Sequence, residues 1–207
     1  MRHIALNNYR DTPLSIMVAC GPFTFKNSLT YQCLSDFLQV VKKDQPHAVV
    51  LMGPFLDIYN TDIMSGELYY QSEKDAVYIT HEQLFQDLIR MIADELNGLR
   101  TKIIFVPSHK DIMHFETLPQ ASFSNKFFNS LFGQAVLVGN PDIVQLNDFK
   151  LGFINTDVMK DMCTNMVVKN FDTPKIDLSL QAMLEQRTFY PCYPANPDVP
   201  IEYSQIE

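Results

Sequence analysis

Several features of secreted and membrane proteins are missing from this 207-residue sequence. It has only four cysteines, Cys20, Cys33, Cys163 and Cys192, which are too few and too scattered for a disulfide framework or a Cys-x-x-Cys metal site. No apolar run approaches the roughly 20 residues of a membrane-spanning helix. The first residues contain no apolar segment of the kind found in secretory signals. We therefore expect an intracellular protein, neither secreted nor inserted in a membrane, with its thiols reduced and buried.

Basic residues are also scarce. The sequence has 16 Lys and Arg against 24 Asp and Glu, which gives a formal net charge of −8 at pH 7. Its longest basic cluster is the pair Lys42-Lys43. Because nucleic-acid-binding modules hold phosphates with a basic patch, strong direct DNA binding is not expected. With 46% hydrophobic and 19% charged residues, the composition is that of a globular protein of one or two domains.

The first half of the chain alternates apolar strands with amphipathic helices. Apolar runs at 14–20, 48–52 and 102–106 predict buried strands, and each is followed by Pro or Gly-Pro. Helices are expected over 30–43 and after Thr80, which begins a capping-box pattern. This order predicts an α/β fold in which helices cover both faces of a parallel sheet.

The second half predicts a different arrangement. Short strands are expected at 135–138, 143–146 and 151–154, close enough in sequence for an antiparallel second layer or a sheet edge. One more helix is expected over 177–186. The side chains of this helix that we expect to face inward are Leu178, Met183 and Leu184.

Two segments outside this pattern are candidates for contacts. Residues 57–79 form a long polar connection without a clear period, and its length suggests a lid or a contact loop. The proline-rich stretch after 186 can be neither a helix nor an inner strand. Its aromatic residues Phe189, Tyr190 and Tyr193 have two interpretations: an anchor for a partner, or a strap that closes over the core.

Ligands of an open α/β sheet bind beyond the carboxyl ends of the strands. Three such ends are visible, at 20–22, 53–55 and 107–111, and we expect functional residues to cluster in these loops. Asp57 and Asp111 lie in or beside them, and we expect both carboxylates to cap loops or to accept backbone N–H groups.

The succession of strand, tip and helix, repeated three times, resembles the calcineurin-like metallophosphoesterases, whose tips carry Asp and His ligands of two metal ions. The resemblance implies a layered sheet with flanking helices. Here, however, Pro54 occupies the position of the bridging Asp, and Lys110 would place an ammonium beside a metal ion. We therefore expect no catalytic residue, no metal and no cofactor. The degenerate ligand positions are Cys20, Pro22, Pro54, His109, Lys110 and Asp111.

Four segments resemble the B subunits of eukaryotic replicative DNA polymerases, and the alpha type most of all. Each segment is short, but their order and spacing are specific, and together they cover about residues 14 to 203. The segments are 18–24, 53–57, 105–111 and 186–194.

This resemblance implies a non-catalytic nuclear scaffold for the initiation of DNA replication. The implied partner is the C-terminal domain of the polymerase alpha catalytic subunit and, indirectly, primase. The chain would consist of a lead-in at 1–13 and a degenerate phosphoesterase-like domain at 14–207, without the oligonucleotide-binding-type domain and the last strands of the family.

Two alternatives stay open from the sequence. One is a divergent metal-dependent phosphoesterase that holds a single metal ion through His109, His114 and a nearby carboxylate. The other is the B subunit of polymerase delta or epsilon.

Overall fold

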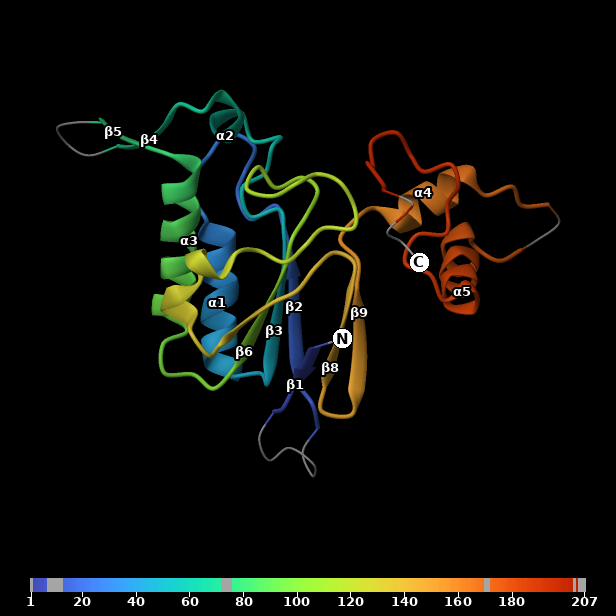
Figure 1. The fold of residues 1–207 in the computed structure, drawn as a ribbon, viewed down its shortest axis with the longest axis horizontal. Coiled ribbons are helices and arrows are strands. Elements are labelled where there is room, and N and C mark those ends of the chain that lie inside the picture. Colours follow the sequence, from blue (N-terminus) through green and yellow to red (C-terminus); the bar gives the residue numbers. More distant parts are fainter. Residues whose placement is uncertain (1, 7–12, 72–75, 170–171, 203, 205–207) are drawn as a thin grey trace.

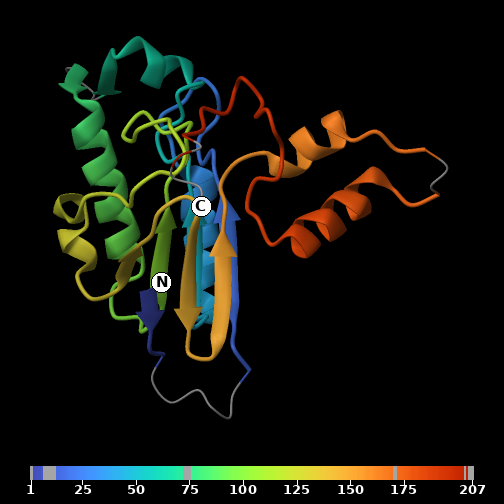
Figure 2. The same ribbon diagram turned by 45° about the vertical axis from the view of Figure 1, so that its right-hand side comes forward.

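The described part of the chain has two facing sheets with helices on one side, a projecting two-stranded hairpin and a helical extension, as Figures 1 and 2 show. The computed structural model describes residues 2–6, 13–71, 76–169, 172–202 and 204. In these ranges no helix is both long enough and apolar enough to cross a bilayer.

Four parallel strands form the first sheet. In spatial order they are β2 (Ile16–Cys20), β3 (Ala48–Met52), β6 (Lys102–Val106) and β7 (Ala135–Leu137). The last residues of the first three strands, Cys20, Met52 and Val106, are in register, so these strands end together at one edge. All three predicted strands are present, and β3 and β6 are buried as predicted. The expectation of burial is wrong for β2, because it is an edge strand in which Val18 is 60% exposed. Of the two arrangements expected for the later strands, an antiparallel second layer or a sheet edge, β7 has the second, because it lies at the edge of this sheet and pairs parallel with β6.

Two amphipathic helices, α1 (Gln32–Asp44) and α3 (His81–Glu95), cover one face of this sheet. Helix α3 begins at the predicted capping box: Thr80 Oγ1 accepts from the backbone N–H of Gln83, whose side chain accepts from the backbone N–H of Thr80. Both helices bury the apolar stripe that the sequence predicted. In α1 the buried residues are Leu34, Leu38 and Val41.

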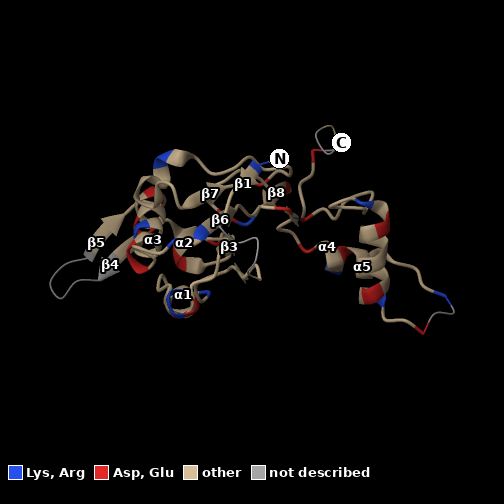
Figure 3. Ribbon diagram, turned by 90° about the horizontal axis from the view of Figure 1, so that it is seen from below, with Lys and Arg blue, Asp and Glu red and all other residues tan. Residues whose placement is uncertain are grey.

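A second sheet covers the other face. Strand β8 (Asp142–Leu146) pairs antiparallel with β9 (Phe149–Phe153) and parallel with β1 (Arg2–Ile4), which lies within the expected lead-in. Figure 3 places α1 and β8 on opposite sides of the first sheet. The expectation of helices on both faces is therefore wrong. Alternate apolar residues of β8 and β9, such as Val144 and Leu151, cover that face instead.

The connection 57–79 contains regular structure that the sequence did not predict. Asn60 caps the short helix α2 (Thr61–Ser65), because its side-chain oxygen accepts two backbone N–H groups of that helix. Strands β4 (Leu68–Gln71) and β5 (Ala76–Ile79) then form an antiparallel hairpin that projects from the body (Figure 1). These elements are too short to show a period in the sequence. The role of the connection as a lid or a contact loop stays a prediction.

Two helices, α4 (Val158–Asn165) and α5 (Lys175–Gln186), pack on each other in the extension (Figure 2). Helix α4 was not predicted, whereas α5 confirms the last predicted helix. The expectation that Leu184 faces inward is wrong, because this side chain is 78% exposed. The buried side of α5 contains Ser179 and, one turn later, Met183. Leu184 is the next residue after Met183, so its side chain is turned by about 100° around the helix axis, away from the buried side.

None of the four cysteines is buried, contrary to the expectation. Cys20 and Cys33 are exposed, and Cys163 and Cys192 are half-buried. Cys33 lies on the solvent side of α1, beside the buried Leu34, and Cys20 lies at the open end of an edge strand. Leucine, isoleucine, valine and phenylalanine fill the interior instead.

A candidate binding site at the carboxyl ends of the strands

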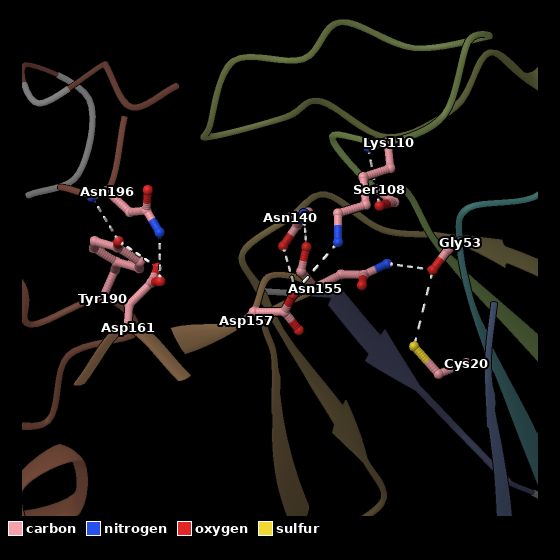
Figure 4. Close-up of polar contacts among 10 residues, drawn as sticks. All are labelled: Cys20, Gly53, Ser108, Lys110, Asn140, Asn155, Asp157, Asp161, Tyr190 and Asn196. Atoms are coloured by element: carbon pink, nitrogen blue, oxygen red, sulfur yellow. Dashed lines mark hydrogen bonds and ion pairs between the residues drawn. The ribbon is translucent and has the colours of Figure 1, made fainter. Parts of the chain in front are cut away.

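The three predicted loops meet at the carboxyl ends of the parallel strands (Figure 4). Gly21 follows β2 and Gly53 follows β3. A Cβ atom on Gly21 would overlap the backbone of Pro54, and a Cβ atom on Gly53 would overlap the carboxylate of Asp111. Both positions therefore require glycine, because the loops approach each other too closely for any side chain.

Asp111 joins the second loop to the third. Its carboxylate is buried and accepts hydrogen bonds from the backbone N–H groups of Phe55, Leu56 and Ser108. Burial raises the pKa of Asp111 from 3.8 to about 7 and outweighs the three donors, which lower it. Asp57 accepts a backbone N–H within its own turn. These contacts confirm that both carboxylates accept backbone N–H groups.

A buried amide network holds a fourth loop, which follows β9, against the same cluster (Figure 4). Asn155 Nδ2 donates to the carbonyl oxygens of Gly53, at 2.9 Å, and Pro107, at 3.0 Å. The backbone N–H of Asn155 donates to Asn140 Oδ1 at 2.7 Å. Asn140 is fully buried and donates in turn to Gln120 Oε1 at 2.9 Å. This network ties the second sheet to the strand ends of the first.

A cavity of about 470 Å³ opens over the four loops. Of the six positions that the sequence analysis expected to be degenerate, Asp111 does not line this cavity and the other five do. The fourth loop adds Asn155, Thr156 and Asp157. These five lining residues are Cys20, Pro22, Pro54, His109 and Lys110.

Cys20 and Lys110 both line this cavity, and neither is arranged for catalysis. The Cys20 thiol lies 3.9 Å from the carbonyl oxygen of Gly53. Although Cys20 is exposed as a residue, partial burial of its thiol raises the pKa of this group, and the carboxylate of Asp157 raises it further. Lys110 Nζ lies 3.4 Å from Asp157 Oδ2 and forms an exposed ion pair with it. A thiol held in its neutral form is a weak nucleophile, so the geometry does not favour covalent catalysis at Cys20.

His109 is a buried ring with one unpaired nitrogen. The side chain is 7% exposed, and its Nδ1 has no hydrogen-bond partner among the described residues. Burial lowers the pKa of His109, and the charge of Lys110 lowers it further, so the ring is neutral at pH 7. Thr156 Oγ1 is a second buried atom without a partner in the described ranges. Both residues also line a smaller cavity of about 160 Å³ beside the first.

The residues around these cavities do not fit the two metal ions of a phosphoesterase. The side chain of Pro54 has no metal-ligating atom, both oxygens of Asp111 accept backbone N–H groups, and Lys110 adds a positive charge. His114 lines neither cavity, and its ring packs against a core phenylalanine, so the fold does not unite it with His109. In the described part of the chain no three His, Cys, Asp or Glu side chains are grouped so that they could hold a metal ion.

The aromatic segment after α5 is partly built into the fold. The hydroxyl of Tyr190 donates to Asp161 Oδ2 at 2.8 Å, and burial raises the pKa of Tyr190 to about 12. The half-buried ring of Phe189 lies against Gly152 of β9. Tyr193, in contrast, is 85% exposed. Tyr190 therefore straps the segment to α4, and Tyr193 is the most accessible of the three rings.

Sequence reasoning missed the fourth loop and the amide network. The polar residues 155–157 directly follow the predicted strand 151–154, which is the same signal that identified the other three loops. The burial of Asn140 has no signal in the sequence, because Gly-Asn-Pro is typical of a turn and does not indicate that the amide is buried.

A family model for the DNA polymerase alpha/epsilon B subunit matches residues 16–206. The chain belongs to this family. The match includes all four loops of the cavity and both helices of the extension. It confirms the resemblance that was inferred from the four segments of the sequence.

Curated proteins similar to this chain are named as B subunits of DNA polymerase alpha. The DNA polymerase alpha B subunit of Mus musculus is 27% identical over 193 residues, which cover 92% of this chain and 31% of that protein. The corresponding protein of Dictyostelium discoideum is 29% identical, covering 93% of this chain and 29% of that protein. For Saccharomyces cerevisiae the values are 27% identity, 91% of this chain and 27% of that protein. The chain thus spans about a third or less of the length of these relatives.

Proposed function

We propose that the chain is a non-catalytic accessory subunit of DNA polymerase alpha–primase that acts in the nucleus during the initiation of DNA replication. In this role it binds the C-terminal domain of the catalytic subunit and is linked to primase through it. The observation that carries the proposal is the family match over residues 16–206, together with relatives named as B subunits of DNA polymerase alpha.

The chemistry of the strand ends supports a role without catalysis. The underlying fold in this proposal is a calcineurin-like phosphoesterase fold whose ligand positions are degenerate. Its one buried carboxylate at the tips, Asp111, is occupied by backbone N–H groups, and the cation Lys110 lines the cavity. These residues stabilise the loops rather than activate a water molecule.

The charge distribution supports an indirect association with DNA. The net charge is −8, and the basic residues drawn in Figure 3 are scattered over the ribbon rather than gathered on one face. Such a surface does not favour binding to a phosphate backbone. In the proposed role, contact with DNA is therefore made by the partner subunits.

Co-purification tests the proposal. The 207-residue chain is co-expressed with the C-terminal domain of a polymerase alpha catalytic subunit, and the complex is analysed by size-exclusion chromatography with light scattering. We expect a 1:1 complex. The matched control is the C-terminal domain of a polymerase delta catalytic subunit, with which no complex is expected. A folded chain that does not bind the alpha domain would contradict the proposal.

Metal analysis separates this proposal from the divergent phosphoesterase. The chain is purified without chelator, its Mn and Zn contents are measured, and hydrolysis of bis(p-nitrophenyl) phosphate is assayed. The proposed role predicts no stoichiometric metal and no hydrolysis above background. One metal ion per chain together with turnover would support the phosphoesterase instead.

A further inference from the structure

The unpaired atoms of His109 and Thr156 distinguish one side of the strand-end cavity. Folded proteins pair nearly all buried polar atoms, because an unpaired atom loses its hydrogen bonds to water without replacement. Here two such atoms belong to residues that line the same two adjoining cavities. Their coincidence points to a missing hydrogen-bonding group at this place.

The unpaired ring nitrogen is an acceptor. The ring is neutral at pH 7, so one of its two nitrogens carries no proton, and with the proton on Nε2 this nitrogen is Nδ1. A neutral imidazole that donates through one nitrogen presents a lone pair at the other. The hydroxyl of Thr156 can accept as well. The missing group is therefore an N–H or O–H donor.

The charges around the two cavities favour a cation as that donor. Four carboxylates and two ammonium groups line the cavities, so the lining has an excess of negative charge. Lys110 is already paired with Asp157, and that ion pair is exposed and correspondingly weak. The carboxylates are Asp57, Asp157, Asp161 and Asp198, and the ammonium groups are Lys110 and Lys160.

We propose that these two cavities receive the guanidinium group of an arginine side chain from a protein partner. A guanidinium is planar, always charged and carries five N–H donors, so it can donate to His109 Nδ1 and Thr156 Oγ1 while it pairs with the carboxylate of Asp157. A phosphate or another anion would meet acceptors and carboxylates instead. The claim that the arginine belongs to a protein rests on the proposed accessory role. The claim that the cavities bind a guanidinium rests only on the residues that line them.

Titration with small probes tests the cavity itself. The isotope-labelled 207-residue chain is titrated with N-acetyl-arginine amide and observed by NMR, including the ring nitrogens of His109. We expect saturable shifts at His109, Thr156 and Asp157. N-acetyl-citrulline amide has nearly the same shape without the charge and should bind at least tenfold more weakly, and inorganic phosphate should cause no saturable shift there.

Two variants locate the binding. Asp157→Asn removes the exposed carboxylate and should lower the affinity for the arginine probe at least fivefold. Thr156→Val should lower this affinity at least twofold. The matched control, Asp148→Asn, changes an exposed carboxylate in the turn between β8 and β9, at the far end of these strands, and should leave binding unchanged.

Three results would overturn the inference: equal binding of the arginine and citrulline probes, saturable phosphate binding without arginine binding, or unchanged affinity in both Asp157→Asn and Thr156→Val. The titration uses the chain alone. Its failure is therefore distinguishable from a failure to bind the catalytic subunit, which is measured by co-purification.

Discussion

The two sides of the strand-end cluster differ in how completely their polar groups are paired. On the side of β3 and β6, Asp111 accepts three backbone N–H groups and the Asn155 amide donates to two carbonyl oxygens. On the side that faces α4, His109 Nδ1 and Thr156 Oγ1 have no partner in the described residues. A polar residue at a strand end can therefore be a structural support or an unused binding group, and its hydrogen bonds distinguish the two.

The comparison makes opposite predictions for the two sides. Changes on the paired side should lower the free energy of unfolding, because they leave buried backbone groups without partners. Changes on the unpaired side should leave stability nearly intact, since no intramolecular hydrogen bond is lost there.

The largest expected effect is the pH dependence set by Asp111. Its pKa is about 7 in the folded chain against an ordinary value of 3.8, so the folded state holds this proton more tightly. The resulting stabilisation is complete below pH 3.8 and is lost as the pH rises from there through 7. At 1.36 kcal/mol per pKa unit, the loss is roughly 4 kcal/mol.

The variant Asp111→Asn tests this effect by urea unfolding at pH 4.5, 6 and 8. The amide keeps one acceptor oxygen but does not titrate, so the wild-type loss of stability between these pH values should be absent. Asp148→Asn, an exposed carboxylate, should keep the wild-type pH dependence. Equal slopes for the wild type and Asp111→Asn would show that the buried carboxylate does not change its protonation in this range.

A second large effect is expected for Gly53→Ala. The added methyl group would overlap the Asp111 carboxylate and approach Ser108, so the two loops must separate. We expect a loss of about 3 kcal/mol in the free energy of unfolding. The control is Gly66→Ala, where φ is +72° but no atom lies within 4 Å, and its backbone strain should cost only about 1 kcal/mol. Equal losses in the two variants would mean that the loops are not held in contact.

A smaller loss, about 2 kcal/mol, is expected for Asn155→Ala. This change leaves the carbonyl oxygens of Gly53 and Pro107 without their side-chain donor. Asn129→Ala is the matched control, because Asn129 is exposed and donates to a single carbonyl oxygen, and it should change stability by less than about 0.5 kcal/mol. Urea unfolding at pH 7 measures the free energy of unfolding of both variants. A loss for Asn155→Ala no greater than that of the control would show that the Asn155 amide does not hold the loops together.

The sequence predicted the first sheet and its helices because their signals are local and strong. The strands at 48–52 and 102–106 are continuous apolar runs, and the capping box at Thr80 is visible in four residues. The second sheet was harder to place. The pairing of β1 with β8 joins residues about 140 positions apart, and no local pattern specifies such a contact.

The site was predictable in position but not in chemistry. Gly-Pro pairs and polar tips located three of the four loops, because parallel strands end at one edge. The chemistry of the site depends on the surroundings that the fold gives each buried residue. Asp111 and His109 lie two residues apart, yet Asp111 accepts from three donors and a nitrogen of His109 has no partner among the described residues. A sequence shows which groups are present but not which partners they meet.

The smallest expected effect concerns the unpaired side. Thr156→Val replaces a buried hydroxyl that has no described partner by a methyl group of similar size. We expect a change within about 0.5 kcal/mol, in either direction, because no hydrogen bond is lost. Thr101→Val is the matched control, since Thr101 is also buried but its hydroxyl donates to the Pro46 carbonyl oxygen at 2.7 Å.

Thr101→Val should therefore cost about 1 to 2 kcal/mol under the same conditions, because it leaves a buried carbonyl oxygen unpaired. The difference between the two valine variants measures the contrast between a paired and an unpaired hydroxyl directly. If both variants lose the same stability, then Thr156 Oγ1 is hydrogen-bonded in the chain alone, for example to a buried water molecule. In that case an incoming donor would have to displace this partner, and the unpaired side would no longer differ from the paired one.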